Sequence, residues 1–287
     1  KDVFEYYRER NGFYKEYKKF LRVSAPVSSL DAFFESKPYE AVILGSDEIW
    51  NIENRNIGYV AAYFSHGIKA KKIISYATSF GTPNAIDNLP SEALIALKRI
   101  QYLSVRDELS KRRLESLSLS SVKCLDPTFL FDIKNFEKPL LRNEYTFLYF
   151  NNDKPEIQRK IHEFSVREGL SLVSAGQVKT FCDFRVKYVS PLKWLGVLNN
   201  AKYVITNALH GVIFSILKKK PFLVLKDCQL KVSEIIEDLL LQDCFVSGDE
   251  DLGMHLRSLR VDYEKVFKTI EEKRKESESF LRKSLSI

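Results

Sequence analysis

Short apolar runs rich in Val, Ile and Tyr alternate along the chain with segments whose apolar positions recur every three to four residues. A strand that is buried on both faces of a parallel sheet reads as a continuous apolar run, and its parallel neighbour requires a crossover connection, usually a helix. The alternation therefore predicts an α/β fold made of βα units around parallel sheets.

The first half of the chain predicts one α/β layer. Two segments of helical period lie among four strand-like runs, and Pro and Ser open the first of these helices. The predicted strands are residues 40–44, 72–77, 102–105 and 122–125, and the predicted helices are residues 90–99 and 107–117.

A second α/β layer follows a break in the pattern. Residues 126–144 carry Asp-Pro, a second Pro and mixed charge without a clean period, which is typical of a link between domains. We expect two domains, residues 1–130 and 131–287, in agreement with a length of 287 residues. The second domain has predicted strands at residues 145–150, 171–174, 203–206 and 222–225, and predicted helices at residues 155–168, 191–199, 210–218 and 231–241.

Two further helices flank the layers. Residues 2–22 interleave aromatic residues with Lys and Arg, which fits a basic aromatic surface for nucleic acid or a membrane, or an amphipathic helix docked by its aromatic rings. Residues 261–285 keep a helical period amid dense charge, and we expect a long surface helix in the second domain.

Composition narrows the class of protein. Lys and Arg number 45 against 38 Asp and Glu, and this net charge of +7 favours anionic partners without choosing among phosphorylated small molecules, lipid head groups and nucleic acid. No apolar run approaches the ~20 residues of a membrane-spanning helix. The four cysteines form no C-x-x-C pair, and we expect them to be reduced.

Polar side chains follow the predicted strands, at the edge where parallel α/β sheets bind ligands. They include hydroxyl, carboxylate, guanidinium and imidazole groups. Asp47, Asp107 and Asp126 have an alternative role as helix caps or turn braces, and His210 has one as a structural histidine. The candidate site residues at this edge are Ser46, Asp47, Glu48, Ser79, Arg106, Asn207, Leu209 and His210.

Three of these features together describe an anion site. Asn207 is placed to cap a helix, whose free N–H groups and positive dipole end favour an anion. Arg106 suits the bidentate capture of a carboxylate or a phosphate. With His210 beside the helix start, the pattern predicts a site for a small, doubly anionic ligand.

Several common motifs are absent from the sequence. It has no G-x-G-x-x-G, no G-x-x-x-x-G-K-[ST] and no H-E-x-x-H. We therefore expect chemistry on an anionic donor without a metal ion or a bound cofactor.

Five strings, in order and over much of the chain, resemble the polysaccharide pyruvyl transferase family. They are YEAVILGSDEIWN, KKIISYATSFG, LSVRDELS, CLDPTFLF and AKYVITNALHGVIFSILKKKPF. The resemblance implies two Rossmann-like domains facing a cleft, as in glycosyltransferase-B folds. It also implies transfer of an enolpyruvyl unit from phosphoenolpyruvate to a sugar of a bacterial surface polysaccharide, giving a pyruvate ketal. By the same resemblance, Arg106, Leu209 and His210 bind the donor in this chain.

The sequence departs from the family pattern at two points. Ala208 stands where family members often carry Arg or Ser, so the donor phosphate would depend on Arg106, His210 and backbone N–H groups. The strand and Asn-Tyr-Gly loop with which the family usually begins do not precede the first 21 residues. We therefore expect the first domain to lack its first strand in this chain.

The resemblance and the chemistry of the residues suggest roles for the site. His210 is the candidate acid or base, because histidine titrates near neutral pH. Asp47 or Glu48 would accept hydroxyl protons or orient the sugar, with Trp50 as a stacking face and Ser46 and Ser79 on the acceptor side.

Two alternatives to this function stay open. They are a sugar-nucleotide glycosyltransferase on the same scaffold and an inactive carbohydrate-binding homologue. The expected partners are phosphoenolpyruvate and a sugar, and lipid-linked sugars are among the candidates. We expect no nucleic acid as a partner. The expected location is the cytoplasm, with peripheral contact to the inner membrane face through residues 1–22.

Overall fold

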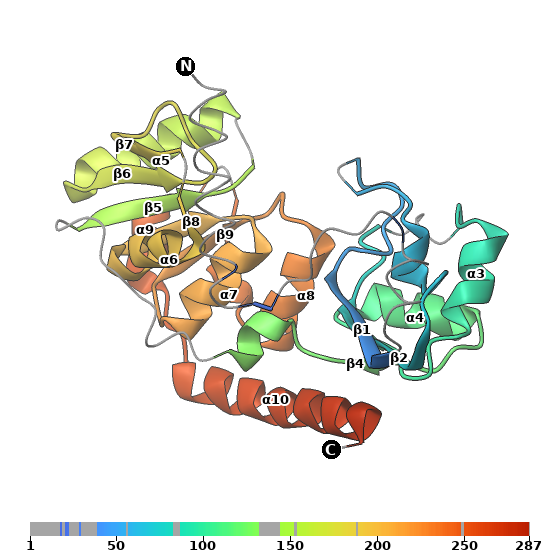
Figure 1. Ribbon diagram of the computed structural model, residues 1–287. Helices are drawn as coiled ribbons and strands as arrows, with labels where there is room; N and C mark the ends of the chain where they lie inside the picture. Colours follow the sequence, from blue (N-terminus) through green and yellow to red (C-terminus); the bar gives the residue numbers. More distant parts are fainter. Residues whose placement is uncertain are drawn as a thin grey trace. The chain divides into compact units, whose positions relative to one another are not determined.

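Two parallel sheets organise the protein, whose structure is a computed structural model (Figure 1). The chain divides into two units, which we call the four-stranded unit (Ala25–Phe131 with Phe267–Ile287) and the six-stranded unit (Lys1–Ser24 with Asp132–Val266). The structure describes residues 18, 21–22, 29, 39–55, 57–82, 87–131, 144–151, 154–187, 189–247 and 250–286.

Three expectations concern segments that fall largely outside the described residues. The helix expected at residues 2–22, and with it the membrane contact, is described only at Lys18, Leu21 and Arg22. Residues 132–143 of the expected link and most of the chain before Tyr39 also lie outside. The membrane contact and the lack of a first strand therefore stay predictions.

The four-stranded unit has its parallel strands in the order of the sequence, β1-β2-β3-β4. Its core includes Ile73, Phe80, Leu97 and Leu114, which come from β2, the loop that follows it and the two helices. The elements are β1 (Tyr39–Asp47), η1 (Ala61–Phe64), β2 (Ala70–Thr78), α3 (Ser91–Leu97), β3 (Ser104–Val105), α4 (Glu108–Ser116), β4 (Val122–Lys123) and η2 (Pro127–Leu130).

The last helix, α10 (Tyr263–Leu285), belongs from Phe267 onward to the four-stranded unit. Hydrogen bonds fix it there, because Ser277 Oγ accepts from the Leu125 N–H at 2.9 Å and Arg274 Nη2 donates to the Phe129 carbonyl at 2.8 Å. This differs from the expected boundary, which placed the whole helix in the second domain. The sequence showed an amphipathic helix but not which core would receive its apolar face.

The six-stranded unit has the strand order β10-β9-β8-β5-β6-β7, with all strands parallel. The chain runs from β5 outward to β7, crosses back to β8 and then continues to β10, which is the doubly wound order of dinucleotide-binding sheets. The strands are β5 (Tyr145–Tyr149), β6 (Ser171–Ala175), β7 (Phe184–Val186), β8 (Tyr203–Thr206), β9 (Phe222–Leu225) and β10 (Phe245–Val246).

Helices cover the six-stranded sheet in two groups (Figure 1). One group pairs α5 with α9, and the other is a row in which α7 contacts both α6 and α8. The order in which the chain adds strands reverses between β5 and β8, so their carboxyl ends mark the topological switch point. The helices are α5 (Pro155–Glu168), α6 (Pro191–Asn200), α7 (Leu209–Leu217), α8 (Leu230–Asp238) and α9 (Leu252–Ser258), and a short η3 (Gln242–Cys244) precedes β10.

The predicted α/β class with two parallel sheets is confirmed. No helix in the part of the chain that the structure describes is long and apolar enough to cross a membrane.

Candidate functional site

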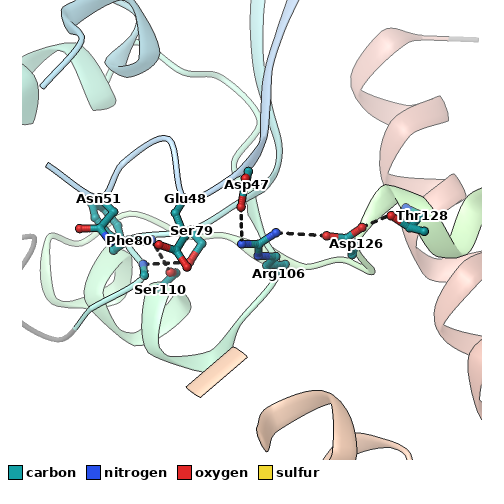
Figure 2. A network of polar contacts seen from close by, with 10 residues as sticks. Asp47, Glu48, Asn51, Ser79, Phe80, Arg106, Ser110, Asp126 and Thr128 are labelled. Carbon is teal, nitrogen blue, oxygen red and sulfur yellow. Dashed lines mark hydrogen bonds and ion pairs between the residues drawn. The ribbon is translucent and has the colours of Figure 1, made fainter. Parts of the chain in front are cut away.

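The carboxyl edge of the four-stranded sheet gathers polar side chains from all four of its strands (Figure 2). Asp47 ends β1, Ser79 follows β2, Arg106 follows β3 and Asp126 follows β4. Their proximity follows from topology, since parallel strands present their carboxyl ends at one edge. The sequence prediction that these loops converge holds within this unit.

Arg106 lies between two carboxylates in Figure 2. Its Nη2 is 2.7 Å from Oδ1 of Asp47, and its Nη1 is 3.1 Å from Oδ2 of Asp126. The side chains of Arg106 and Asp126 are 4% and 3% exposed, whereas that of Asp47 is 61% exposed. The guanidinium is therefore a buried group that reaches the solvent-facing carboxylate from within the unit.

Two carboxylates at this edge cap helices, which is the alternative role that their sequence positions suggested. Asp107 Oδ1 accepts from the Ser110 N–H at 2.7 Å and thereby caps α4. Asp126 Oδ1 accepts from the Thr128 N–H at 3.0 Å at the start of η2. Asp47 caps neither helix, and its backbone φ of 80° places it in the left-handed region.

Glu48 is buried beside the loop that follows β2. Its Oε2 accepts from Nδ2 of Asn51 at 3.1 Å, and Ser79 Oγ accepts from the Gly81 N–H at 2.9 Å. Gly81 has a φ of 69°, and a Cβ there would lie 2.6 Å from Oε2 of Glu48. Glu48 and Ser79 thus brace this loop, while Ser46 lies half-buried at the end of β1.

Trp50 is a core residue, and the prediction that it offers a stacking face is wrong. Its side chain is 0% exposed and packs against Phe64 and Phe80. Its Nε1 donates to the Tyr63 carbonyl at 2.8 Å. The ring face that would receive a sugar is covered by protein atoms.

The six-stranded unit places Asn207, Leu209 and His210 at the start of α7, beside the topological switch point. Leu209 is buried and His210 is exposed, with its ring centroid 6.2 Å from that of Phe214. Gly211 lets this turn approach β8 closely, because a Cβ there would lie 2.2 Å from Oγ1 of Thr206. The first turn of α7, which carries the exposed His210, therefore packs closely on β8.

Asn207 does not cap α7, contrary to the prediction. The N-cap is Ala208, which offers no side-chain hydrogen bond, so no side chain at that position accepts from the first N–H groups of the helix. Asn207 is instead buried and joins neighbouring loops, because its Oδ1 accepts from the Asn151 N–H at 3.0 Å and its Nδ2 donates to Oδ1 of Asp227 at 3.4 Å.

Asn151 and Asp227 are the residues at this edge that sequence reasoning missed. Asn151 follows β5 and Asp227 follows β9, so both occupy the polar positions after strands that singled out the other candidates. Their positions after strands could have singled them out in the sequence. Only the structure shows that Asn207 forms hydrogen bonds with both.

A tyrosine in one strand of each sheet stays protonated at neutral pH. Burial raises the pKa of Tyr149 at the end of β5, and burial raises the pKa of Tyr76 in β2 strongly. Neither phenol is a ready base. Within the described ranges, no cluster of three or more His, Cys, Asp or Glu residues is arranged to hold a metal ion.

Comparison with known proteins agrees with the geometry. A UDP-N-acetylglucosamine 2-epimerase structure matches with a TM-score of 0.55 and 12% identity, over 88% of this chain and 74% of that one. The UDP-GlcNAc 2-epimerase of Methanocaldococcus jannaschii, in complex with UDP-GlcNAc and UDP, matches with a TM-score of 0.49 and 14% identity, over 85% and 72%. At these identities the first likeness shows the fold alone, and it confirms the expected glycosyltransferase-B-like class.

The family of the chain follows from its sequence. A search of curated proteins finds no match. The family model described as polysaccharide pyruvyl transferase matches residues 3–227, which is most of the chain and includes every candidate site residue. The chain therefore belongs to the polysaccharide pyruvyl transferase family.

Proposed function

We propose that this protein transfers the enolpyruvyl unit of phosphoenolpyruvate to a sugar of a bacterial surface polysaccharide and closes it to a pyruvate ketal. The family match over residues 3–227 carries the proposal. The exposed imidazole of His210 in the first turn of α7, and the exposed carboxylate of Asp47, support it.

The donor would bind at the start of α7. The first N–H groups of a helix carry partial positive charge and satisfy phosphate or carboxylate oxygens well. Ala208 supplies no capping oxygen that would compete with a ligand for these N–H groups. Leu209 would pack beneath the donor, and His210 would face it from solvent.

The reaction needs one proton delivered and two removed. A proton added at C3 of phosphoenolpyruvate makes C2 electrophilic, and histidine is the side chain suited to deliver it near neutral pH. A sugar hydroxyl then bonds to C2 and loses its proton. The bond between C2 and the phosphate oxygen breaks, and a second hydroxyl attacks C2 and closes the ketal. Hydrogen phosphate leaves with one of the hydroxyl protons.

The acceptor sugar would bind at the carboxyl edge of the four-stranded sheet. Asp47 offers an exposed carboxylate there, and the half-buried Ser46 precedes it in β1. Ser79, which we expected on the acceptor side, is 1% exposed and braces the loop after β2 instead. We assign the removal of a hydroxyl proton to Asp47. Glu48 would act indirectly by bracing the loop after β2 through Asn51.

A glycosyltransferase that uses a sugar nucleotide is the second candidate. The doubly wound order of the six-stranded sheet favours it, because such sheets bind nucleotides at the switch point between β5 and β8. The diphosphate would use the same N–H groups of α7. Fold alone does not decide between the two chemistries.

Ligand-dependent stabilisation separates these candidates. A ligand that binds the folded state raises the melting temperature, by more the further its concentration exceeds its Kd. We expect phosphoenolpyruvate to raise the melting temperature, and UDP-, GDP- and CMP-sugars to leave it unchanged. Selective stabilisation by a nucleotide sugar would refute the pyruvyl transfer proposal in favour of the second candidate.

The proposed donor also implies a location. Phosphoenolpyruvate is a metabolite of the cytoplasm, so we place the reaction there, with free or lipid-linked sugars as acceptors. Flotation with liposomes tests whether the protein rests on a membrane surface. Binding to anionic but not to neutral liposomes would support peripheral contact, and negligible binding to both would reject it.

A further inference from the structure

The C-terminal helix α10 contacts the loop after β4 on both sides of Asp126. Before Asp126, the Leu125 N–H donates to Oγ of Ser277 at 2.9 Å. After it, the Phe129 carbonyl accepts from Nε and Nη2 of Arg274 at 3.1 and 2.8 Å. Ser277 is 1% exposed, so water does not compete for its hydrogen bond. The helix therefore fixes the backbone on either side of a buried carboxylate.

The sheet holds this loop only at its start. β4 has two residues, and the Cys124 N–H makes one further backbone hydrogen bond, to the Val105 carbonyl of β3 at 2.8 Å. At the next residue side chains take over, because Ser277 binds the N–H of Leu125 and the Tyr76 hydroxyl donates to its carbonyl at 3.0 Å. The place of the loop beyond Cys124 thus depends on these side chains, and α10 supplies one of the two at Leu125.

Asp126 links this loop to Arg106. Its Oδ2 is 3.1 Å from Nη1 of Arg106, and the two side chains are 3% and 4% exposed. Water cannot replace either partner in a buried ion pair, and loss of the pairing leaves a buried charge without compensation. A displacement of the loop therefore displaces the guanidinium with it.

The other arm of Arg106 faces solvent-accessible groups. Its Nη2 is 2.7 Å from Oδ1 of Asp47, whose side chain is 61% exposed (Figure 2). An anion that enters from solvent can displace Asp47 from this arm while Nη1 stays paired with Asp126. This arrangement agrees with the family resemblance, by which Arg106 binds the donor.

We propose that Ser277 and Arg274 are positioning residues for donor binding, which they support through Asp126 and Arg106. This inference rests on the proposed pyruvyl transfer. The family model matches residues 3–227, whereas α10 begins at Tyr263, so the family assignment itself says nothing of this helix. In this inference α10 acts on the donor only by holding the loop whose carboxylate orients the guanidinium.

Calorimetric titration of the full chain with phosphoenolpyruvate, without acceptor, tests this inference. The variants are Ser277→Ala and Arg274→Ala. The matched controls are Ser279→Ala and Arg282→Ala, which remove the same kinds of side chain from exposed places on α10. The titration gives the Kd of the binding-competent protein and, separately, the fraction of molecules that bind. A role in stability alone lowers that fraction and leaves the Kd unchanged.

We expect the Kd for phosphoenolpyruvate to rise by ~2- to 10-fold in Ser277→Ala and in Arg274→Ala, which is about the contribution of one hydrogen bond. Arg106→Lys should raise the Kd by ~10-fold or more, because a lysine cannot hold a buried carboxylate and an anion with separate arms. Both controls should bind phosphoenolpyruvate like the wild type.

Three outcomes overturn the inference and leave the pyruvyl transfer proposal standing. They are a wild-type Kd in both variants, a wild-type Kd in Arg106→Lys, and controls that weaken binding as much as the variants do. If the wild type does not bind phosphoenolpyruvate, the proposed function fails and the inference fails with it. The side chain of Arg274 is 31% exposed, so Arg274→Ala decides the matter if Ser277→Ala does not fold.

Discussion

Three aspartates lie at the carboxyl ends of strands in the four-stranded sheet but differ in burial and hydrogen bonding. They are Asp47, Asp107 and Asp126. Asp107 and Asp126 are buried and accept hydrogen bonds from the N–H groups of the helices they cap. Asp47 caps neither of those helices and keeps its carboxylate exposed on a left-handed backbone. A non-glycine residue in that region costs of order 1 kcal/mol or more, and such residues cluster at functional sites. At the residue scale, burial decides which carboxylate can meet a substrate.

His210 gives the first prediction at the residue scale. It is exposed in the first turn of α7, so His210→Ala removes little buried surface and should leave the melting temperature near that of the wild type. Turnover should fall by ~10²- to 10⁴-fold, because a positioned acid or base contributes that much, with a smaller effect on donor affinity. Phosphate release and calorimetry measure the two effects. A variant that unfolds, with full activity in its surviving fraction, would show that His210 is structural.

Prediction from sequence succeeded at the centre of the six-stranded sheet and failed at its edges, whereas both edge strands of the four-stranded sheet were predicted. The central strands β8 and β9 have the predicted bounds, because residues buried on both faces form continuous apolar runs. The edge strands β7 and β10 were not predicted, since they have three and two residues and β7 is largely exposed. The loops after the predicted strands supplied the candidate site. Trp50 was misjudged because its burial depends on Phe64, Tyr63 and Phe80, which are distant in sequence.

The contact between α7 and β8 gives a prediction at the element scale. Alanine favours a helix over glycine, but a Cβ at Gly211 would lie 2.2 Å from Oγ1 and 2.9 Å from Cβ of Thr206. We expect Gly211→Ala to lower the free energy of unfolding by ~1–3 kcal/mol, as overpacking does. Urea denaturation measures the change.

Gly253→Ala is the matched control for this substitution. Gly253 also lies in a helix, but its nearest neighbours are the flexible ends of Arg167 and Arg257 at 3.0 and 3.2 Å, which can move aside. We expect Gly253→Ala to leave the free energy of unfolding nearly unchanged. Equal losses in both variants would show that close packing of α7 on β8 is not what requires Gly211.

At the scale of the whole molecule, α10 ties the end of the chain to its first half. The helix begins in one unit and, from Phe267, packs on the other, where Phe280 and Leu281 contact a small core around Tyr76 and Cys124. An amphipathic pattern predicts that a helix docks but not where, because the receiving surface is built from strands more than a hundred residues earlier. The domain boundary therefore needed the structure.

Thiol reactivity tests the packing of both units at once. All four cysteines are free, and three of them are buried in the two cores while Cys228 is only half-buried. Burial raises the pKa of Cys124, raises that of Cys182 to about 11 and raises that of Cys244 to about 12. The reactive thiolate of these three groups therefore forms only at alkaline pH.

We expect a disulfide reagent at pH 8 to label one thiol quickly in the native protein and four after denaturation. Cys228→Ser should remove the fast reaction, and mass spectrometry of the labelled protein identifies the site. Raising the pH should speed the reaction of the buried thiols, because their raised pKa values leave them protonated at lower pH. Two or more fast thiols in the native protein at pH 8 would contradict the packing of the cores.

The most direct test of the central claim is product formation from phosphoenolpyruvate. The full chain is incubated with phosphoenolpyruvate and a panel of free, nucleotide-linked and lipid-linked sugars, and phosphate and the sugar product are followed together by NMR. Pyruvyl transfer predicts that phosphate and a ketal methyl signal rise in equal amounts with at least one acceptor, and that Asp47→Asn suppresses both. Consumption of a nucleotide sugar with no loss of phosphoenolpyruvate, or no turnover with any acceptor, would contradict the account.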